Sequence, residues 1–320
     1  MRYFITGGAG FIGSNMADAL AKDGNNHITI FDNLSTGFEE FIRPLMSKDK
    51  DNVRIVIGDL LDGKKLNEAI KDSEFVFHFA ANADVRSGYL HPGKDLEQNT
   101  IATYNVLEAM RLNGVNNIAF SSTGSVYGEA KKIPTPEDAS FPVQTSFYAS
   151  SKLAGEALIS SYCEAFGFTG YIFRFVSILG ERYTHGHVFD FYGQLLQNPD
   201  ELYILGNGKQ KKSYLYISDC IDAMLMITQK AKSAVNIYNL GTDEYCEVDD
   251  SVRWICEYMG LNPKLAYSGG DRGWIGDIPF IFLDCSKLKT LGWKAEFSIK
   301  QAVIKTIQYI ERNRWIYEKR

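Results

Sequence analysis

The chain opens with MRYFITGGAGFIGSNMADALAKDGNNHITIFDN, residues 1–33, in the order β-strand, glycine-rich turn, helix and second strand. Arg2 to Thr6 is a short apolar run suited to a buried strand, and Phe11 to Lys22 lacks Pro and is rich in good helix formers. The glycines between them leave the turn free of side chains. The first N–H groups of the helix and the positive end of its dipole therefore face the space above the turn, where a pyrophosphate would fit.

The glycine spacing satisfies two dinucleotide-binding patterns. Gly8, Gly10 and Gly13 form G-x-G-x-x-G, while Gly7, Gly10 and Gly13 form G-x-x-G-x-x-G. Glycines alone are also compatible with a tight turn that binds nothing. The strand–helix–strand context favours a dinucleotide, as does Asp32, which lies close to the roughly 20 residues beyond the turn expected of a ribose-binding acid. Because a carboxylate repels a 2′-phosphate, Asp32 favours NAD over NADP.

The composition is that of an ordinary globular protein, and 320 residues can bury a large core as one extended domain or two intimate ones. A net charge of only −5 argues against a nucleic-acid partner. The five Cys include no C-x-x-C pair and no His at ligand spacing, so we expect reduced cysteines and no metal site. Met1 leads directly into the first strand, and no apolar run approaches the ~20 residues of a membrane span. We therefore expect a cytoplasmic protein with no membrane partner.

Short apolar runs recur between helix-like stretches, at 27–31, 53–57, 75–79, 117–121 and 171–175. This alternation predicts an α/β fold with a doubly wound parallel (Rossmann) sheet, whose ligands collect at the carboxyl ends of the strands. After residue 175 the alternation loosens into Gly-, Asn- and aromatic-rich loops. We expect an NAD-binding domain of residues 1–176 with about 213–241, and a smaller substrate-binding domain of residues 177–212 and 242–320.

Residues that follow the third and fourth runs are candidates for the cofactor site. Asp59 would either cap the next helix or meet adenine, and the small Ala80 and Ala81 would let a cofactor lie close to the backbone. A long helix is predicted over 95–112, and it carries Asn99.

A second predicted helix, over 148–166, places Tyr148 and Lys152 one turn apart on the same face. An adjacent ammonium and a cationic nicotinamide would stabilise a phenolate, so that Tyr148 can take a proton from a sugar hydroxyl while hydride leaves the same carbon. Thr123, which lies 25 residues upstream, would hydrogen-bond the reacting oxygen. Taken alone, such a pair is more often a solvated helix face, and Thr123 could simply bond the backbone at the end of a strand.

Together, TGGAGFIG (6–13), DNLSTG (32–37), GDL (58–60), HFAA (78–81), Asn99, SSTGSVYG (121–128) and Y-x-x-x-K (148–152) resemble the extended short-chain dehydrogenase/reductase family. Within it, they resemble the nucleotide-sugar 4-epimerases of the UDP-glucose 4-epimerase type. The resemblance covers essentially the whole chain and is strongest through residue 175. It implies an isomerase with tightly held NAD that inverts C4 of a nucleotide sugar, UDP-glucose/UDP-galactose first, through a transient 4-keto intermediate.

The resemblance also implies a homodimer and a set of site residues. The Asn99 and Tyr148 helices would pair with their copies, with contributions from Leu96, Leu107 and Leu158. Thr123, Tyr148 and Lys152 match the family's catalytic residues. The residues implied to hold NAD are Gly7, Gly10, Phe11, Ile12, Gly13, Asp32, Asn33, Ser35, Thr36, Gly37, Asp59, Leu60, Phe79, Ala80, Ala81, Asn99, Tyr148, Lys152 and Val176. The residues implied to contact the substrate are Thr123, Tyr148, Ser177, Lys212, Tyr214 and Arg272.

Departures from the family pattern bear on the reaction and on its specificity. Related dehydratases resemble S-T-D-E-V-Y-G and related decarboxylases S-T-S-E-V-Y-G, whereas this chain has Gly124 and Ser125 and so lacks the general acid for elimination. Ser177 replaces an Asn that touches the substrate diphosphate. Lys212 replaces an Arg and cannot form its bidentate fork, which Arg272 would then supply.

Three alternatives remain open beside the leading assignment. One is an epimerase of another nucleotide sugar (CDP-, GDP-, UDP-uronate or N-acetyl), and another is a 4,6-dehydratase, disfavoured by Ser125. The third is a non-catalytic NAD-binding protein on the same fold.

Overall fold

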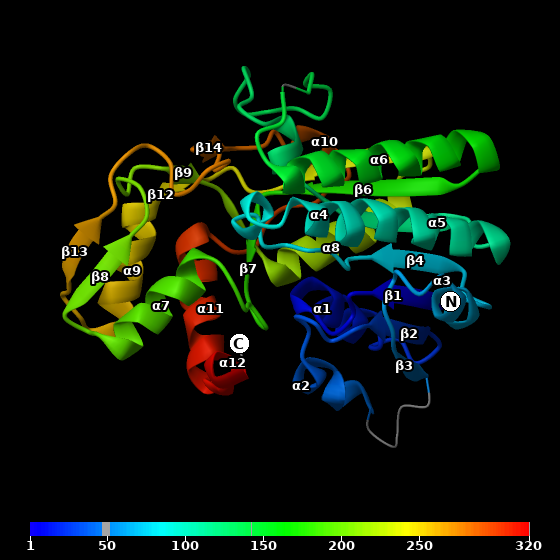
Figure 1. The fold of residues 1–320 in the computed structure, drawn as a ribbon, viewed down its shortest axis with the longest axis horizontal. Helices are drawn as coiled ribbons and strands as arrows, with labels where there is room; N and C mark the ends of the chain where they lie inside the picture. Colours follow the sequence, from blue (N-terminus) through cyan, green and yellow to red (C-terminus); the bar gives the residue numbers. More distant parts are fainter. Residues whose placement is uncertain (47–51, 142, 320) are drawn as a thin grey trace.

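In the computed structural model, which describes residues 1–46, 52–141 and 143–319, a seven-stranded sheet forms the centre of the molecule (Figure 1). All its strand pairs are parallel, in the order β11-β6-β5-β4-β1-β2-β3. The strand order reverses between β1 and β4, as expected of a doubly wound sheet. The predicted fold class is therefore confirmed. The strands are β1 (Arg2–Thr6), β2 (His27–Asp32), β3 (Val53–Ile57), β4 (Phe75–His78), β5 (Asn117–Thr123), β6 (Thr169–Phe175) and β11 (Val235–Leu240).

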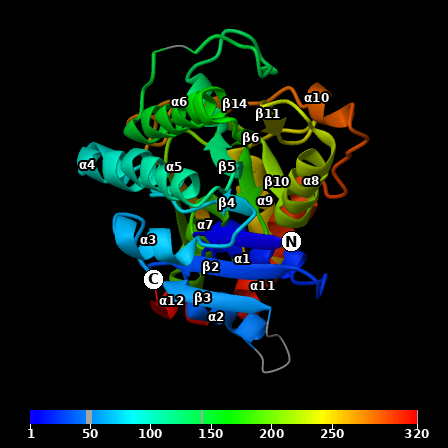
Figure 2. The same ribbon diagram turned by 90° about the vertical axis from the view of Figure 1, so that its right-hand side faces the viewer.

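Helices cover both faces of this sheet (Figure 2). Alternate strand residues point to opposite faces, so that Phe4 packs in one hydrophobic cluster with α3, α5 and α6, while Ile5 packs in the other with α1 and α8. The helices are α1 (Phe11–Leu20), α2 (Glu39–Ile42), α3 (Gly63–Ala69), α4 (Pro92–Asp95), α5 (Ala102–Leu112), α6 (Phe147–Phe166), α8 (Ile217–Lys230) and α10 (Ser286–Lys289), with the 3-10 turns η1 (Arg43–Met46), η2 (Ser87–Tyr89) and η4 (Gly124–Tyr127) and the π-helical segment η3 (Leu96–Ile101).

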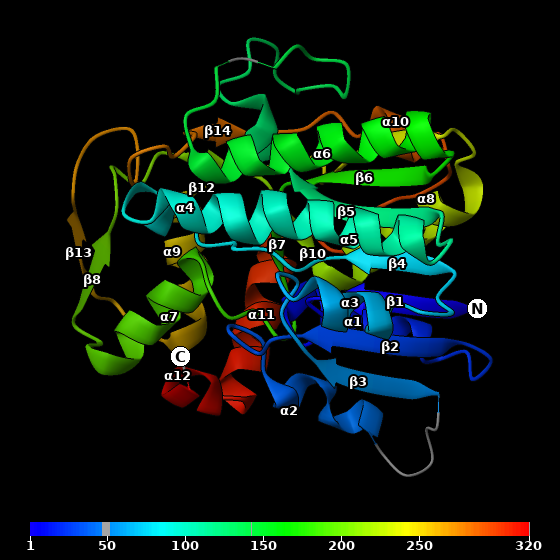
Figure 3. The same cartoon turned by 45° about the vertical axis from the view of Figure 1, so that its right-hand side comes forward.

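A second part of the molecule lies beyond the carboxyl ends of the strands (Figure 3). It contains small sheets: β7 pairs with β10, β8 pairs with β13, and β9 lies between β12 and β14. The hydrophobic cluster around α1 and α8 continues into α7 and α11, so both parts share one core. The proposed domain boundaries stay a prediction. The elements are β7 (Ser177–Leu179), β8 (Glu201–Ile204), β9 (Lys211–Lys212), β10 (Tyr214–Tyr216), β12 (Cys246–Glu247), β13 (Lys264–Tyr267), β14 (Phe280–Ile281), α7 (His187–Gln197), α9 (Val248–Met259), α11 (Ile299–Arg312) and α12 (Trp315–Lys319).

Local sequence explains where α6 begins and ends. The Ser146 hydroxyl accepts a hydrogen bond from Ala149 N at 3.1 Å and so caps the helix. The helix therefore begins at Phe147, one residue before the predicted start. Gly167 ends it with a φ of 70°, a left-handed conformation that suits glycine.

The predicted helix over 95–112 is present but not uniform. It begins three residues earlier because Pro92 occupies the first turn, and residues 96–101 widen into a π-helix before α5 continues. Leu107 is fully buried in the core beneath α5. The expectation that Leu107 contributes to a dimer interface is therefore wrong, whereas Leu96 is exposed.

A buried ion pair fastens α6 to the sheet. Arg174 on β6 donates from Nη2 to Glu156 Oε2 at 2.7 Å and from Nε to Glu156 Oε1 at 3.1 Å. Ser122 also donates to Glu156, and Arg174 Nη1 donates to Tyr127 Oη at 2.7 Å. Since both charges are removed from water, each is tolerated only because the other is present.

We expect Glu156→Gln to lower the free energy of unfolding by about 3–5 kcal/mol, because it leaves the Arg174 guanidinium buried without a counter-charge. The measurement is urea unfolding followed by circular dichroism. Arg253→Gln, which breaks an exposed pair with Asp250, is the control and should cost less than about 1 kcal/mol. Equal losses of unfolding free energy in the two variants would contradict the conclusion that the Glu156–Arg174 pair is a buried ion pair on which the fold depends.

Candidate functional site

A cavity of about 890 Å³ lies between the carboxyl ends of the main strands and the second part of the molecule. Ligands of doubly wound sheets bind at this edge. Asp59, Asn99, Lys152 and Arg272 are not among its lining residues. The predicted residues that do line it are Gly7, Gly10, Phe11, Ile12, Gly13, Asp32, Asn33, Ser35, Thr36, Gly37, Leu60, Phe79, Ala80, Ala81, Thr123, Tyr148, Val176, Ser177, Lys212 and Tyr214.

The glycine-rich turn has no room for a side chain at Gly7 or Gly13. Gly7 has a φ of 67°, and a Cβ there would lie 2.6 Å from Ala80 N. A Cβ on Gly13 would overlap Gly7 O. The first turn of α1 has neither a side-chain cap nor an acidic residue, and its backbone lines the cavity. The turn therefore fits a pyrophosphate, which would accept from these N–H groups.

Asp32 ends β2 at the rim of the same cavity. Its carboxylate accepts from Ala9 N at 2.9 Å and from Leu34 N at 2.8 Å, and burial raises its pKa against the effect of these two bonds. The neighbouring Asn33 donates to Asp59 Oδ2 at 2.9 Å. Asp62, not Asp59, caps α3, so the helix-capping interpretation of Asp59 is wrong.

Thr123 and Tyr148 meet where β5 delivers its last residue to the cavity. Both side chains line the cavity there, and Thr123 Oγ1 accepts from Ser125 N at 3.1 Å. Burial raises the pKa of Tyr148 to about 12, and the neighbouring Thr123 hydroxyl opposes that shift. Tyr148 is therefore a neutral phenol at pH 7 in this structure.

Lys152 follows Tyr148 by one turn of α6 and is only 2% exposed, which excludes the solvated-face interpretation. Its Nζ donates to Ser121 O at 2.7 Å and lies 4.6 Å from the centre of the Phe120 ring. Burial lowers the pKa of Lys152 to about 7, opposed by the carboxylates of Glu156 and Asp95. An ammonium with a pKa near 7 can gain or lose its proton close to physiological pH.

Asn99 joins the segment after β4 to α6. Its Oδ1 accepts from Asn82 N at 2.7 Å, and its Nδ2 donates to Ser151 Oγ at 2.9 Å. Asn99 is thus fully engaged by protein groups next to the cavity, and its predicted cofactor contact remains a prediction.

At the opposite end of the cavity, Lys212 is held by its own neighbours. Its Nζ donates to Asp277 Oδ1 at 2.8 Å and to Ile278 O at 2.6 Å, with the Trp274 ring 6.0 Å away. Since Asp277 neutralises the ammonium, Lys212 offers a bound anion less charge than a free lysine would.

The guanidinium of Arg272 is bonded outside the cavity lining. It donates to Glu129 Oε1 at 2.6 Å and to Asp277 O at 2.9 Å. A substrate contact by Arg272 would require these partners to be exchanged, and that contact also remains a prediction.

Sequence reasoning missed several polar lining residues, among them Arg86, Asp190, His187, Gln210 and Trp274. Arg86 follows β4, so the rule about strand ends could have found it. The others lie on α7 and on loops of the second part, whose placement no local pattern reveals.

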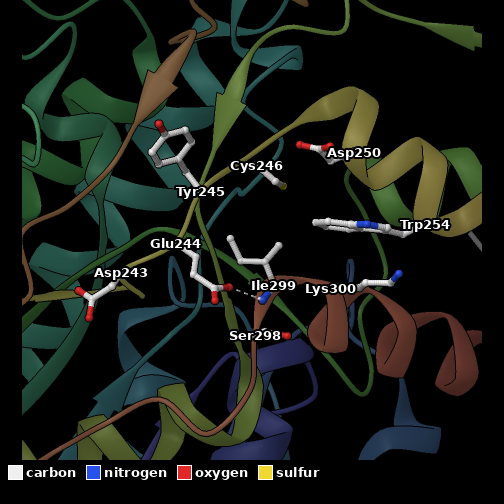
Figure 4. A pocket seen from close by; sticks show the side chains of 9 residues that line it. All are labelled: Asp243, Glu244, Tyr245, Cys246, Asp250, Trp254, Ser298, Ile299 and Lys300. Carbon is white, nitrogen blue, oxygen red and sulfur yellow. Dashed lines mark hydrogen bonds between the residues drawn. The ribbon is translucent and has the colours of Figure 1, made fainter.

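A second, smaller cavity of about 470 Å³ lies between the β12–α9 region and the start of α11 (Figure 4). Glu244 accepts from Ile299 N there at 3.0 Å. None of the predicted site residues lines it. Within the part of the chain that the structure describes, no group of three or more His, Cys, Asp or Glu is placed to hold a metal ion, and no helix is long and apolar enough to cross a membrane.

Residues 3–241 match the model of the NAD dependent epimerase/dehydratase family. The chain belongs to this family. The predicted resemblance and the predicted cofactor, NAD, are thereby confirmed. The glycine-rich turn and Asp32 are where that cofactor's phosphates and ribose would fit.

Similar proteins include several 4-epimerases. A Methanocaldococcus jannaschii protein named "Putative UDP-glucose 4-epimerase" is 33% identical over 97% of this chain and 98% of its own. A crystal structure of UDP-galactose 4-epimerase is 34% identical with a TM-score of 0.88, covering 98% of this chain and 100% of that one. Dehydratases also appear: a dTDP-D-glucose 4,6-dehydratase of Mus musculus is 27% identical over 98% of this chain and 89% of its own. The family thus allows more than one reaction.

The pKa of Lys152 predicts a pH-dependent stability. Because its folded pKa, about 7, lies below its ordinary value of 10.5, the unfolded chain binds more protons between these pH values. The contribution of Lys152 to the free energy of unfolding should therefore rise with pH between about 7 and 10.5. The free energy of unfolding of wild type minus that of Lys152→Met should rise over the same pH range. Urea unfolding at several pH values measures this, with the exposed Lys64→Met as control. A difference that falls with rising pH would show that the pKa is raised instead.

Proposed function

We propose that this protein is an NAD-dependent epimerase that inverts C4 of a nucleotide sugar, with UDP-glucose and UDP-galactose as its preferred pair. The observation that carries the proposal is that Thr123 and Tyr148 line the same cavity as the pyrophosphate-type turn, at the carboxyl ends of the strands. Lys152 follows Tyr148 by one turn of α6 and is buried, with its Nζ bonded to Ser121 O.

In the proposed reaction, Tyr148 accepts the proton of the substrate 4-hydroxyl and later returns it. Thr123 holds the phenol oxygen in place and can bond the same substrate oxygen. The glycine-rich turn and Asp32 would hold NAD, which would supply the hydride acceptor and donor for C4. With a pKa of about 12, the phenol becomes a base only when positive charge is placed beside it. In this proposal the positive charge would come from protonated Lys152, one turn along α6, and from the nicotinamide ring of bound NAD.

The residue at position 125 favours epimerisation over dehydration. Ser125 lines the cavity just beyond Thr123, and a serine hydroxyl is far too weak an acid to protonate a leaving hydroxide. The alternative of a 4,6-dehydratase, which relatives of this chain represent, is therefore the less favoured one.

Lys212 and Arg272 bear on which nucleotide sugar is used. Both cations are already paired, to Asp277 and to Glu129 respectively, so the diphosphate of the substrate must compete for them or be held by backbone groups. The choice of UDP rests on the similar 4-epimerases. Another base, a uronate or an N-acetyl sugar is the second candidate.

We also propose a homodimer formed by the α4–η3–α5 and α6 helices. These run side by side at one surface (Figure 3), which exposes apolar side chains of Leu96, Ile101, Tyr104 and Phe147. Large apolar side chains exposed on two neighbouring helices favour a protein interface there.

Tyr148→Phe removes the proposed base and leaves the ring. We expect kcat for conversion of UDP-galactose to UDP-glucose to fall by about 10²- to 10⁴-fold, with the bound NAD content unchanged. NMR of the sugar anomeric protons measures turnover, and absorbance after denaturation measures NAD. An unchanged kcat would remove Tyr148 from the mechanism. A wild-type protein that interconverts no UDP-sugar would favour the non-catalytic alternative.

Charges placed in the proposed interface should separate the protomers. We expect the double variant Leu96→Asp/Tyr104→Asp to sediment as a monomer at micromolar concentration, because two carboxylates would be buried against an apolar partner surface. Leu265→Asp, on the exposed face of β13, serves as the control and should stay dimeric. A wild-type monomer would contradict the proposed homodimer.

A further inference from the structure

Asp95 is a buried carboxylate that the mechanism above does not use. It ends α4, is 1% exposed and does not line the cavity. Its Oδ1 accepts from Asn82 Nδ2 at 2.9 Å and from Asn99 Nδ2 at 3.1 Å. Its Oδ2 is buried with no hydrogen-bond partner and lies against the backbone of Gly88.

Contacts around Asp95 extend to the residues that precede Tyr148 and Lys152 on α6. A Cβ built on Gly88 would meet Asp95 Oδ2 on one side and Phe147 Cβ on the other, and Phe147 precedes Tyr148. Asn99 carries the network to Ser151, which precedes Lys152. The π-helical segment that follows Asp95 places Asn99 for this contact.

The titratable groups around Lys152 differ in whether they are charged and in whether another side chain already pairs with them. Glu156, one turn along α6, is already bound by the Arg174 guanidinium. His78 on β4 is held between two threonine hydroxyls, and burial lowers its pKa to about 3, so it is neutral. Asp95, from α4, forms no ion pair within the part of the chain that the structure describes. Lys94 and Asp84, which also act on the pKa of Asp95, have opposite signs and opposite effects on it.

We propose that Asp95 is a positioning residue with an electrostatic role: it anchors Asn82 and Asn99 against α6 and supplies a buried negative charge that favours the protonated form of Lys152. This inference rests on the proposed function, since it concerns the two groups that would handle the proton. The same charge disfavours the Tyr148 phenolate. Asp95 therefore affects the pH range in which Tyr148 and Lys152 can take part in proton transfer.

The direction of each effect follows from Coulomb's law. A nearby carboxylate stabilises an ammonium and destabilises a phenolate. Burial has the larger effect on each group: it lowers the pKa of Lys152 and raises the pKa of Tyr148. The Asp95 carboxylate raises both pKa values. Burial also raises the pKa of Asp95 itself, opposed by its bonds to Asn82 and Asn99. The proposal requires that Asp95 remain ionised at pH 7.

Asp95→Asn tests the charge with the least change in shape. The amide oxygen can still accept from Asn82 and Asn99, so the network that positions α6 is preserved while the charge is lost. Glu97→Gln is the matched control, because it removes the same charge two residues away on the exposed side of η3, where water screens it.

Two readouts are needed, one of which does not depend on catalysis. The first is the titration of the Tyr148 phenol by ultraviolet difference spectroscopy, each protein being compared with the same protein carrying Tyr148→Phe. The second is the pH profile of kcat for the UDP-sugar reaction. In Asp95→Asn we expect the phenol titration and the acid limb of kcat each to move down by about one pH unit, with KM unchanged. Glu97→Gln should move neither.

An unmoved phenol titration would overturn the proposal, as would a loss of kcat that is uniform across pH, since that indicates a purely structural role. If wild type catalyses no reaction, the proposed function fails, but the phenol titration still decides the role of Asp95. Should Asp95→Asn not fold, NMR of isotope-labelled aspartate in the wild-type protein decides instead. A protonated Asp95 at pH 7 would overturn the proposal, and an ionised one would support it.

Discussion

Gly7 and Gly13, in the turn of residues 7–13, have no space for a side chain, and this constraint determines how the rest of the site is built. Gly7 lies against the backbone at Ala80, so β1 and the end of β4 approach as closely as two main chains can. Gly13 lets α1 begin directly above the turn. With side chains excluded, the N–H groups of α1 remain open to the cavity, and a pyrophosphate can lie against them. A single Cβ at either glycine would push these elements apart.

The second organising feature is the burial of charge beside this turn. Lys152 is buried one turn along α6 from Tyr148, and Glu156 lies one helical turn further along α6 in its ion pair with Arg174. Burial alone would deprotonate Lys152, and the carboxylates around it oppose that tendency. The ion pair that fastens α6 to β6 is thus also part of the electrostatic surroundings of the proposed catalytic groups. Stability and proton handling depend on the same few side chains.

The substrate end of the cavity is organised differently from the cofactor end. There, Lys212 in the lining is bound to Asp277, Arg272 beside the lining is bound to Glu129, and the lining includes aromatic and amide side chains such as Trp274 and Gln210. In the proposed function, recognition at that end would depend more on shape and hydrogen bonding than on the charge of Lys212 or Arg272. This difference explains why membership of the family leaves the sugar and the base to be proposed.

The sequence by itself determined the parallel sheet, the pyrophosphate-type turn and the pairing of Tyr148 with Lys152. Each depends on a local regularity: alternating apolar runs, glycines at fixed spacing, or two residues one helical turn apart. The tertiary structure decided that Lys152 is buried, that Leu107 faces the core, that Asp62 rather than Asp59 caps α3, and that Asp95 lies against the first turn of α6. It also decided where α7 and the loop of residues 268–279 meet the cavity. These features arise from the packing of segments far apart in the chain and from the desolvation of charge, and neither leaves a periodic signal in the sequence.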